Sequence, residues 1–146
     1  MAKRNRRPRA APPNSKAASQ LILDSGAIIA LARNDVSVRA LLSAALRAGA
    51  RVMVPAVVVA ETFRGRGPRD ARVKRTLAAA DSYLATDEPA ARTAGGLLGD
   101  ARSREAIDAL VVAAAIHAGG GRILTVDPGD LGKLSAGRVD VVIHAI

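Results

Sequence analysis

The sequence predicts an α/β fold in which helices cover both faces of a parallel sheet. Short apolar runs that suit buried strands alternate along the chain with longer segments of helical pattern. The 146 residues suffice for one domain, and 49% of them are hydrophobic, which is enough for a core. Because Phe63 and Tyr83 are the only aromatic residues, that core must consist of alanine and branched aliphatic side chains.

Five short runs are expected to be strands. Each is rich in aliphatic residues and has a length typical of strands that are buried on both faces. In chain order they are residues 21–23 (LIL), 51–54 (RVMV), 82–85 (SYLA), 122–126 (RILTV) and 139–143 (VDVVI).

The segments between these runs are expected to be helices. They are residues 25–35, 36–49, 55–65, a basic stretch after Pro68, 88–101 and 104–120. Gly49, Gly65 and Gly119 stand where a residue just past a helix end adopts a left-handed conformation. The segment PAVVVAE, residues 55–61, is ambiguous because its three valines favour a strand. Its proline suits the first turn of a helix and a glycine follows, so we expect a helix.

The positive charge of the chain is concentrated at the N-terminus. The formal net charge is +9, and residues 1–20 contain six basic residues and no acid. The remaining residues carry 16 basic and 13 acidic side chains. We expect residues 1–20 to form a basic, disordered tail and residues 21–146 to form the folded domain. The tail either binds nucleic acid electrostatically or serves only as a solubilising extension.

The composition excludes several classes of function. Without cysteine, the chain has no disulfide, no zinc–thiolate site and no thiol nucleophile. The scarcity of aromatic residues argues against a platform on which single-stranded bases stack. The longest apolar runs are too short to cross a bilayer, and the basic N-terminus lacks the apolar segment of a signal peptide. We therefore expect a cytoplasmic protein without a membrane partner.

Four acidic residues lie in otherwise apolar surroundings. Asp24 and Asp127 directly follow expected strands, while Glu61 and Asp108 lie within apolar helices. Because the carboxyl ends of parallel strands meet at one edge of the sheet, Asp24 and Asp127 are expected at the same edge. Taken singly, the acids have ordinary explanations: helix capping for the first pair, a favourable helix dipole for Asp108 and an ion pair with Arg64 for Glu61.

Taken together, the four acids indicate a site for a divalent cation. Carboxylates that converge repel one another and raise one another's pKa values, and a bound cation removes this penalty. Mg²⁺ prefers carboxylates, waters and phosphate oxygens as ligands. With two histidines and no cysteine, the chain is poorly supplied for a zinc site.

The segments around these acids resemble the motifs of the PIN domain, and in particular those of the VapC toxins of bacterial toxin–antitoxin pairs. The segments are LILDSGAIIALA, VPAVVVAETFRG, AIDALVVAAAIHAGG and ILTVDPGDLGKL, and the resemblance covers roughly residues 21–146. It implies a PIN-like three-layer sandwich with a five-stranded parallel sheet flanked by helices. It also implies a Mg²⁺- or Mn²⁺-dependent endoribonuclease that cleaves structured RNA (tRNA or rRNA) and inhibits translation. A VapB-like antitoxin, whose C-terminal segment occupies a groove of the toxin, and a homodimer are further implications.

The resemblance also assigns roles to individual residues. The acidic positions of the family match Asp24, Glu61, Asp108 and Asp127. Of these, Asp24, Asp108 and Asp127 are expected to hold the metal, and Glu61 is expected to hold a water or a second ion. Supporting positions, matched by a small hydroxyl residue, a second acid and a less certain serine, are Thr125, Asp130 and Ser25.

A basic segment follows Glu61 directly. Residues 64–75 contain six basic side chains against the single acid Asp70. They form either a rim that contacts RNA phosphates or an ordinary solvated helix face. The six are Arg64, Arg66, Arg69, Arg72, Lys74 and Arg75.

Other functions fit the sequence less well. A phosphatase of the haloacid dehalogenase type requires a second aspartate two residues after the first, where Gly26 stands. A receiver domain requires adjacent acids before its phosphorylated aspartate, and no such pair precedes Asp24. A PIN-domain RNA-processing nuclease that is not a toxin remains an alternative. So does a non-catalytic RNA-binding module, although the presence of all four acids argues against it.

Overall fold

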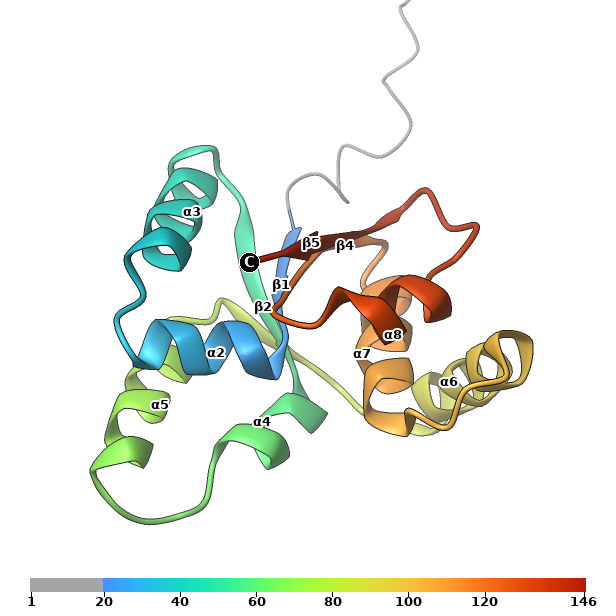
Figure 1. Cartoon of the computed structure of the whole chain (residues 1–146), viewed down its shortest axis with the longest axis horizontal. Helices are drawn as coiled ribbons and strands as arrows, with labels where there is room; N and C mark the ends of the chain where they lie inside the picture. The colour runs from blue at the N-terminus through green and yellow to red at the C-terminus, as the bar shows by residue number, and fades with distance from the viewer. Residues whose placement is uncertain (1–19) are drawn as a thin grey trace, which may run out of the picture.

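The computed structural model describes residues 20–146, so the expected basic tail lies outside the described residues except for Gln20. Strands and helices alternate along this part of the chain (Figure 1). The strands are β1 (Gln20–Leu23), β2 (Arg51–Pro55), β3 (Ser82–Leu84), β4 (Gly121–Thr125) and β5 (Val141–Ala145). The helices are α2 (Ser25–Ala32), α3 (Val36–Arg47), α4 (Ala56–Thr62), α5 (Pro68–Ala78), α6 (Glu88–Ala101), α7 (Ala106–His117) and α8 (Pro128–Leu134).

The five strands form one parallel sheet in the order β3-β2-β1-β4-β5. This confirms the fold class that the alternation of strands and helices predicts. The chain first adds β2 and β3 on one side of β1, and then returns to add β4 and β5 on the other side. The order therefore reverses between β1 and β4, and ligands of such sheets bind outside the carboxyl ends of the strands at this point.

Helices pack on both sides of the sheet and enclose its apolar residues. Figure 1 shows α2, α3 and α5 on one side, and α6, α7 and α8 on the other. The central strand β1 is buried along its whole length, as expected for a strand covered on both faces. Aliphatic side chains such as Ile22, Ile28, Val112 and Ile123 are fully buried around it. Among residues 20–146, no helix combines the length and apolarity that a membrane crossing requires.

The ambiguous valine segment is the helix α4, as predicted, but it begins one residue later than expected. Pro55 is the last residue of β2, where it lies opposite Leu84 of β3, and the helix starts at Ala56. Val58 and Thr62 face the interior, and the Thr62 hydroxyl donates a hydrogen bond to the Val58 carbonyl at 2.8 Å. Burial of one face thus outweighs the weak strand preference of the valines.

Strand ends differ from the prediction at both termini of the domain. The first strand begins at Gln20, whose side-chain amide donates to the carbonyls of Ala118 and Gly120 at 2.9 and 3.2 Å. The last strand runs over Val141–Ala145, two residues later than predicted, and Val139 is 92% exposed. The ends of this strand are set by its pairing with β4, in which Gly121 lies opposite Val141. A run of aliphatic residues alone does not reveal where such pairing begins.

Candidate active site

Asp24 lies at the carboxyl end of β1, and its carboxylate does not cap the following helix. It occupies the N-cap position of α2 but makes no side-chain hydrogen bond to that helix. The residue is only 7% exposed, and its amide donates to the Leu124 carbonyl of β4 at 3.1 Å. The capping explanation for this acid is therefore wrong, and its carboxylate is available for another partner.

Thr125 supplies that partner from the end of the neighbouring strand β4. Its hydroxyl is fully buried and donates a hydrogen bond to Asp24 Oδ2 at 2.8 Å. The same hydroxyl oxygen accepts a hydrogen bond from the Asp127 amide at 3.1 Å. Thr125 thus connects the carboxyl ends of β1 and β4, where the strand order reverses, and restricts the orientation of Asp24.

Glu61 projects from the last turn of α4 toward the same place. Burial raises the pKa of Glu61 above its usual value, and the negative charge of Asp24 raises it further. A hydrogen bond with the Ser25 side chain and the positive charge of Arg64 act in the opposite direction. Glu61, Asp24 and Ser25 therefore lie together, as the sequence predicts for residues of one site.

Asp108 lies in the first turn of α7 and is the most strongly perturbed acid of this group. Its pKa is raised to about 6, first by burial and then by the negative charges of four neighbours: Asp24, Glu61, Asp130 and Glu105. The last four causes indicate that these carboxylates lie near one another, because like charges disfavour the ionised form of Asp108. Acids from β1, α4, α7 and α8 thus converge at the carboxyl edge of the sheet.

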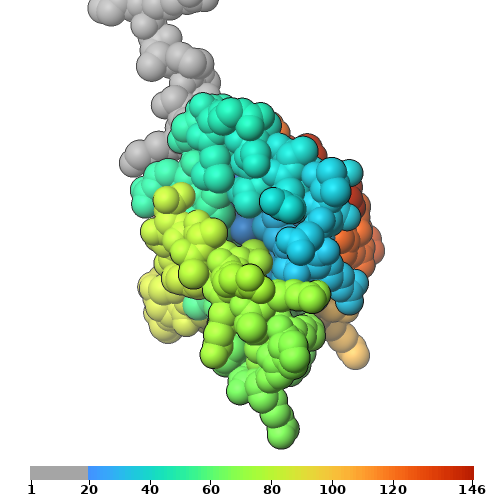
Figure 2. All heavy atoms as spheres, turned by 90° about the vertical axis from the view of Figure 1, so that its left-hand side faces the viewer, coloured from blue at the N-terminus to red at the C-terminus, as the bar shows by residue number. Residues whose placement is uncertain are grey.

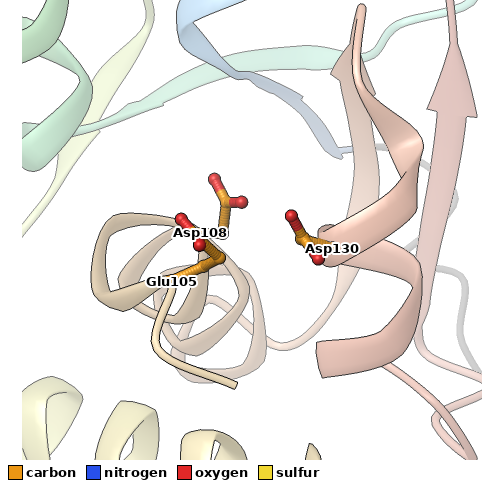
Figure 3. A group of neighbouring side chains, drawn as sticks. All are labelled: Glu105, Asp108 and Asp130. Atoms are coloured by element: carbon orange, nitrogen blue, oxygen red, sulfur yellow. The ribbon is translucent and has the colours of Figure 1, made fainter.

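Three of these acids are close enough to share one ion. One carboxylate oxygen each of Glu105, Asp108 and Asp130 lies within 4.8 Å of the others. Figure 3 shows Asp108 and Asp130 directed toward each other from α7 and α8, with Glu105 beside Asp108. Glu105 was not predicted from the sequence. Its position three residues before Asp108, at the N-cap of α7, is the signal that identifies it in retrospect.

Asp127 takes a different position from the other predicted acids. It is exposed, and its Oδ1 accepts a hydrogen bond from the Gly129 amide at 3.3 Å, which caps α8. Among the acids that the structure describes, Asp130 rather than Asp127 acts on the pKa of Asp108. The role of Asp127 as a metal ligand stays a prediction, and Asp130 adds the carboxylate that reaches Asp108.

The family of the chain follows from its sequence over most of this region. Residues 21–134 match the sequence profile of the PIN domain. The chain belongs to the PIN-domain family. PIN domains are nucleases. The match confirms the family that the four acidic motifs indicate, and its span includes every acid of the site. A search of curated proteins found no match.

Several solved structures, among them members of the VapBC family of toxin–antitoxin systems, share the fold of this PIN domain at low sequence identity. VapBC2 from Rickettsia felis, bound to a promoter DNA fragment, gives a TM-score of 0.69 at 13% identity and covers 87% of this chain and 98% of that one. FitAcB from Neisseria gonorrhoeae gives 0.62 at 20% identity, with coverage of 84% and 95%. VapBC-5 from Mycobacterium tuberculosis gives 0.56 at 21%, with coverage of 88% and 99%.

The donor set of the PIN domain suits a hard divalent cation. The converging side chains offer carboxylate oxygens, the ligands that Mg²⁺ and Mn²⁺ prefer. Within residues 20–146, only one of the converging acids forms an ion pair: Asp130 pairs with Lys133 at 3.3 Å. The converging acids are Asp24, Glu61, Glu105, Asp108 and Asp130. Most of the negative charge is therefore uncompensated by the protein, which makes binding of a cation favourable.

The basic segment of the PIN domain divides between two places. All six predicted side chains are exposed. Arg64 lies next to Glu61, because its charge acts on the pKa of that residue, and Arg66 follows on the same loop. The Lys74 ammonium lies 5.3 Å from the centroid of the Phe63 ring. The remaining three, Arg69, Arg72 and Arg75, line grooves between α5 and the neighbouring helix α2.

The larger of these grooves lies between α2, α3 and α5. It has a volume of about 300 Å³ and an apolar floor that includes Leu23, Leu31 and Leu42. Its polar lining includes three guanidinium groups, those of Arg39, Arg72 and Arg75. Figure 2 shows the hollow, with the blue atoms of β1 visible at its floor.

Proposed function

We propose that this PIN domain is a Mg²⁺- or Mn²⁺-dependent endoribonuclease and the toxin of a VapBC-type toxin–antitoxin pair. One observation carries the proposal: carboxylates from the end of β1 and from α4, α7 and α8 converge at the point where the strand order reverses, and burial together with their negative charges raises the pKa of Asp108 to about 6. The fold shared with VapBC and FitAB structures supports the toxin assignment.

The proposed metal ligands are Asp24, Asp108 and Asp127, with Glu105 and Asp130 as further candidates from the cluster around Asp108. A divalent cation bound here supplies a water of lowered pKa and stabilises negative charge on the scissile phosphate. Thr125 orients the Asp24 carboxylate through its 2.8 Å hydrogen bond. Glu61 holds the attacking water, and its raised pKa makes it a better acceptor of the proton.

The proposed substrate is a structured RNA such as tRNA or rRNA. An acidic pocket repels phosphates, so cationic side chains must lie around it. Arg64 is next to Glu61, and Arg66 is exposed two residues later. Contacts from these side chains to the RNA backbone supply affinity without sequence information.

The proposal is tested by cleavage of RNA. Purified protein is incubated with total tRNA in the presence of Mg²⁺ or Mn²⁺, and the 5′ ends of the products are mapped by sequencing. We expect cleavage that stops in EDTA. In Asp24→Asn we expect the cleavage rate to fall by more than about 100-fold, because loss of a metal ligand should exceed the roughly 10- to 100-fold effect of losing a residue that only hydrogen-bonds a ligand. Full cleavage in EDTA, or by Asp24→Asn, would contradict the proposal.

The proposed partner is a VapB-like antitoxin that occupies the groove between α2, α3 and α5. An apolar floor with three guanidinium groups fits an amphipathic helix that carries acidic residues on its flanks. Leu23 of the floor immediately precedes Asp24, so a segment in this groove ends close to the acids. The variant Arg72→Glu is expected to lose antitoxin binding and keep nuclease activity.

A homodimer is also proposed, and light scattering of the purified toxin tests it.

A further inference from the structure

Asp70 is a buried acid in the middle of the basic segment. It lies in the first turn of α5 and is only 3% exposed, although the basic residues of that segment are all exposed. A buried carboxylate requires hydrogen-bond donors, because its desolvation is otherwise strongly unfavourable. The donors that this carboxylate uses come from the loop between α4 and α5.

The Asp70 carboxylate binds the backbone of that loop. Its Oδ2 accepts hydrogen bonds from the amides of Arg64 and Arg66 at 3.1 and 2.6 Å. Gly65 and Gly67 have positive φ angles of 85° and 91°, which let the loop turn its amides inward around the carboxylate. The side chains of the two arginines are left on the outer surface.

A second set of contacts fixes the same loop to its flanking helices. The Arg64 guanidinium donates to the carbonyls of Ala60 and Phe63 at 2.9 and 3.2 Å, at the end of α4. The Lys74 ammonium of α5 lies over the Phe63 ring. The loop that follows Glu61 connects α4 and α5 (Figure 1) and is therefore held by contacts with both helices.

We infer that Asp70 is a positioning residue for RNA binding: its buried carboxylate holds the loop of residues 63–67, which follows the end of α4, so that the exposed side chains of Arg64 and Arg66 are presented to phosphates. This inference rests on the proposed nuclease function. A loop that is already ordered loses less conformational entropy when its side chains contact phosphates, so the contacts yield more affinity. The acid thereby strengthens the binding of a polyanion.

The sign of the effect separates this role from that of a simple charge. If Asp70 contributed only its negative charge, removing it would tighten RNA binding, because the surface would become more positive. If Asp70 holds the loop, removing it weakens RNA binding despite the gain in positive charge. The two explanations thus predict opposite changes for one substitution.

The test measures binding of fluorescently labelled total tRNA in EDTA, where no cleavage occurs. Asp70→Ala is compared with wild type and with Asp87→Ala, which also removes one acid, the cap of α6 that accepts a hydrogen bond from the Ala90 amide at 3.0 Å. We expect Asp70→Ala to weaken binding roughly tenfold, the order of effect for two side chains that must be newly ordered. Asp87→Ala should bind as wild type does or slightly more tightly.

A second pair of variants tests the loop without changing any charge. Gly65 and Gly49 have nearly equal φ angles of 85° and 83°, and a Cβ at either position meets open space. Alanine therefore introduces the same backbone strain at both sites. We expect Gly65→Ala to weaken RNA binding and Gly49→Ala, at the end of α3, to leave it unchanged. This pair decides the question if Asp70→Ala does not fold.

Cleavage kinetics distinguish positioning from general loss of structure. Under the inference, Asp70→Ala raises KM and leaves kcat at saturating RNA unchanged, because the metal ligands are intact. Binding by Asp70→Ala that equals or exceeds that of wild type overturns the inference, as does an unaffected Gly65→Ala. A wild-type protein that binds no RNA at all would instead contradict the proposed function.

Discussion

The hydrogen bond from Thr125 to Asp24 joins the end of β4 to the end of β1 through side chains at the site. A buried carboxylate that accepts a hydrogen bond from a hydroxyl group is fixed in orientation. It can therefore bind a cation without a further loss of rotamer freedom. The sequence places both residues correctly, because each stands at the end of an apolar run. It does not reveal that one bonds the other, since 101 positions separate them.

A substitution at Thr125 tests this bond. Thr125→Val keeps the shape but removes the hydroxyl, so we expect a decrease of about 1–3 kcal/mol in the free energy of unfolding and of about 10- to 100-fold in metal affinity. Calorimetry of unfolding and of Mn²⁺ binding measures both quantities. Thr125→Ser, which keeps a hydroxyl, is the control. Equal metal affinity in the valine variant would contradict a positioning role.

The raised pKa of Asp108 predicts how the stability of the metal-free protein changes with pH. Its folded pKa of about 6 lies above the ordinary value of 3.8, so the folded state holds the proton more tightly than the unfolded state. Stability therefore falls as pH rises through this interval. Asp108→Asn removes the effect, and in EDTA well above pH 6 we expect it to melt a few degrees higher than wild type.

The same variant must respond differently to a cation. Millimolar Mg²⁺ or Mn²⁺ is expected to raise the Tm of wild type by mass action and to raise that of Asp108→Asn less. Well below pH 3.8 the two metal-free proteins should melt alike, because Asp108 is then protonated in both the folded and the unfolded state. A wild-type Tm that is indifferent to both cations would count against the site.

At the scale of elements, the beginnings of α7 and α8 decide which acids converge. The sequence predicts that acids follow strands and lie near the starts of helices. It does not predict the direction in which each side chain points around the helix axis. Each residue along a helix turns the side chain by about 100°, so the residue at which α8 begins determines whether Asp127 or Asp130 faces Asp108. In the structure α8 begins at Pro128, Asp127 caps it and Asp130 reaches the cluster. The same limit explains why Glu105 was missed.

The contributions of Asp127 and Asp130 are separable by substitution. Asparagine caps helices about as well as aspartate, so Asp127→Asn removes a charge and keeps the cap. We expect Asp130→Asn to lower the Mn²⁺-induced rise in Tm, and Asp127→Asn to lose cleavage activity while keeping the fold. Circular dichroism checks the fold. If Asp127→Asn cleaves as wild type does, Asp127 only caps α8 and Asp130 replaces it in the ligand set.

At the scale of the whole molecule, the concentrated positive charge and the converging acids occupy different parts of the sequence. Residues 1–20 carry six positive charges and the remainder a net charge of +3, while the converging acids all lie in the latter part. Alternating apolar runs and helical patterns suffice to predict the α/β fold of that latter part. The expected tail lies outside the described residues, so its role is a matter for experiment.

Deletion of residues 1–18 tests the contribution of that basic segment. If its side chains bind phosphates, the deletion weakens RNA binding, and the slope of log affinity against log salt decreases by up to about 0.7–0.9 for each phosphate that the tail neutralises. Cleavage at saturating RNA should be unchanged, because no candidate metal ligand is removed. An unchanged salt slope would show that the body of the protein, with Arg64 and Arg66, recruits RNA by itself.

The order of strands in the sheet also has a consequence for synthesis of the protein. β1 is made first, but its partner β4 follows about a hundred positions later, and the bond between Asp24 and Thr125 spans the same interval. A growing chain on the ribosome carries Asp24 and Glu61 long before it carries Thr125 and Asp130. The acids of the candidate site therefore cannot come together until nearly all of the chain has emerged, so under the proposed function an unfinished chain has no complete site.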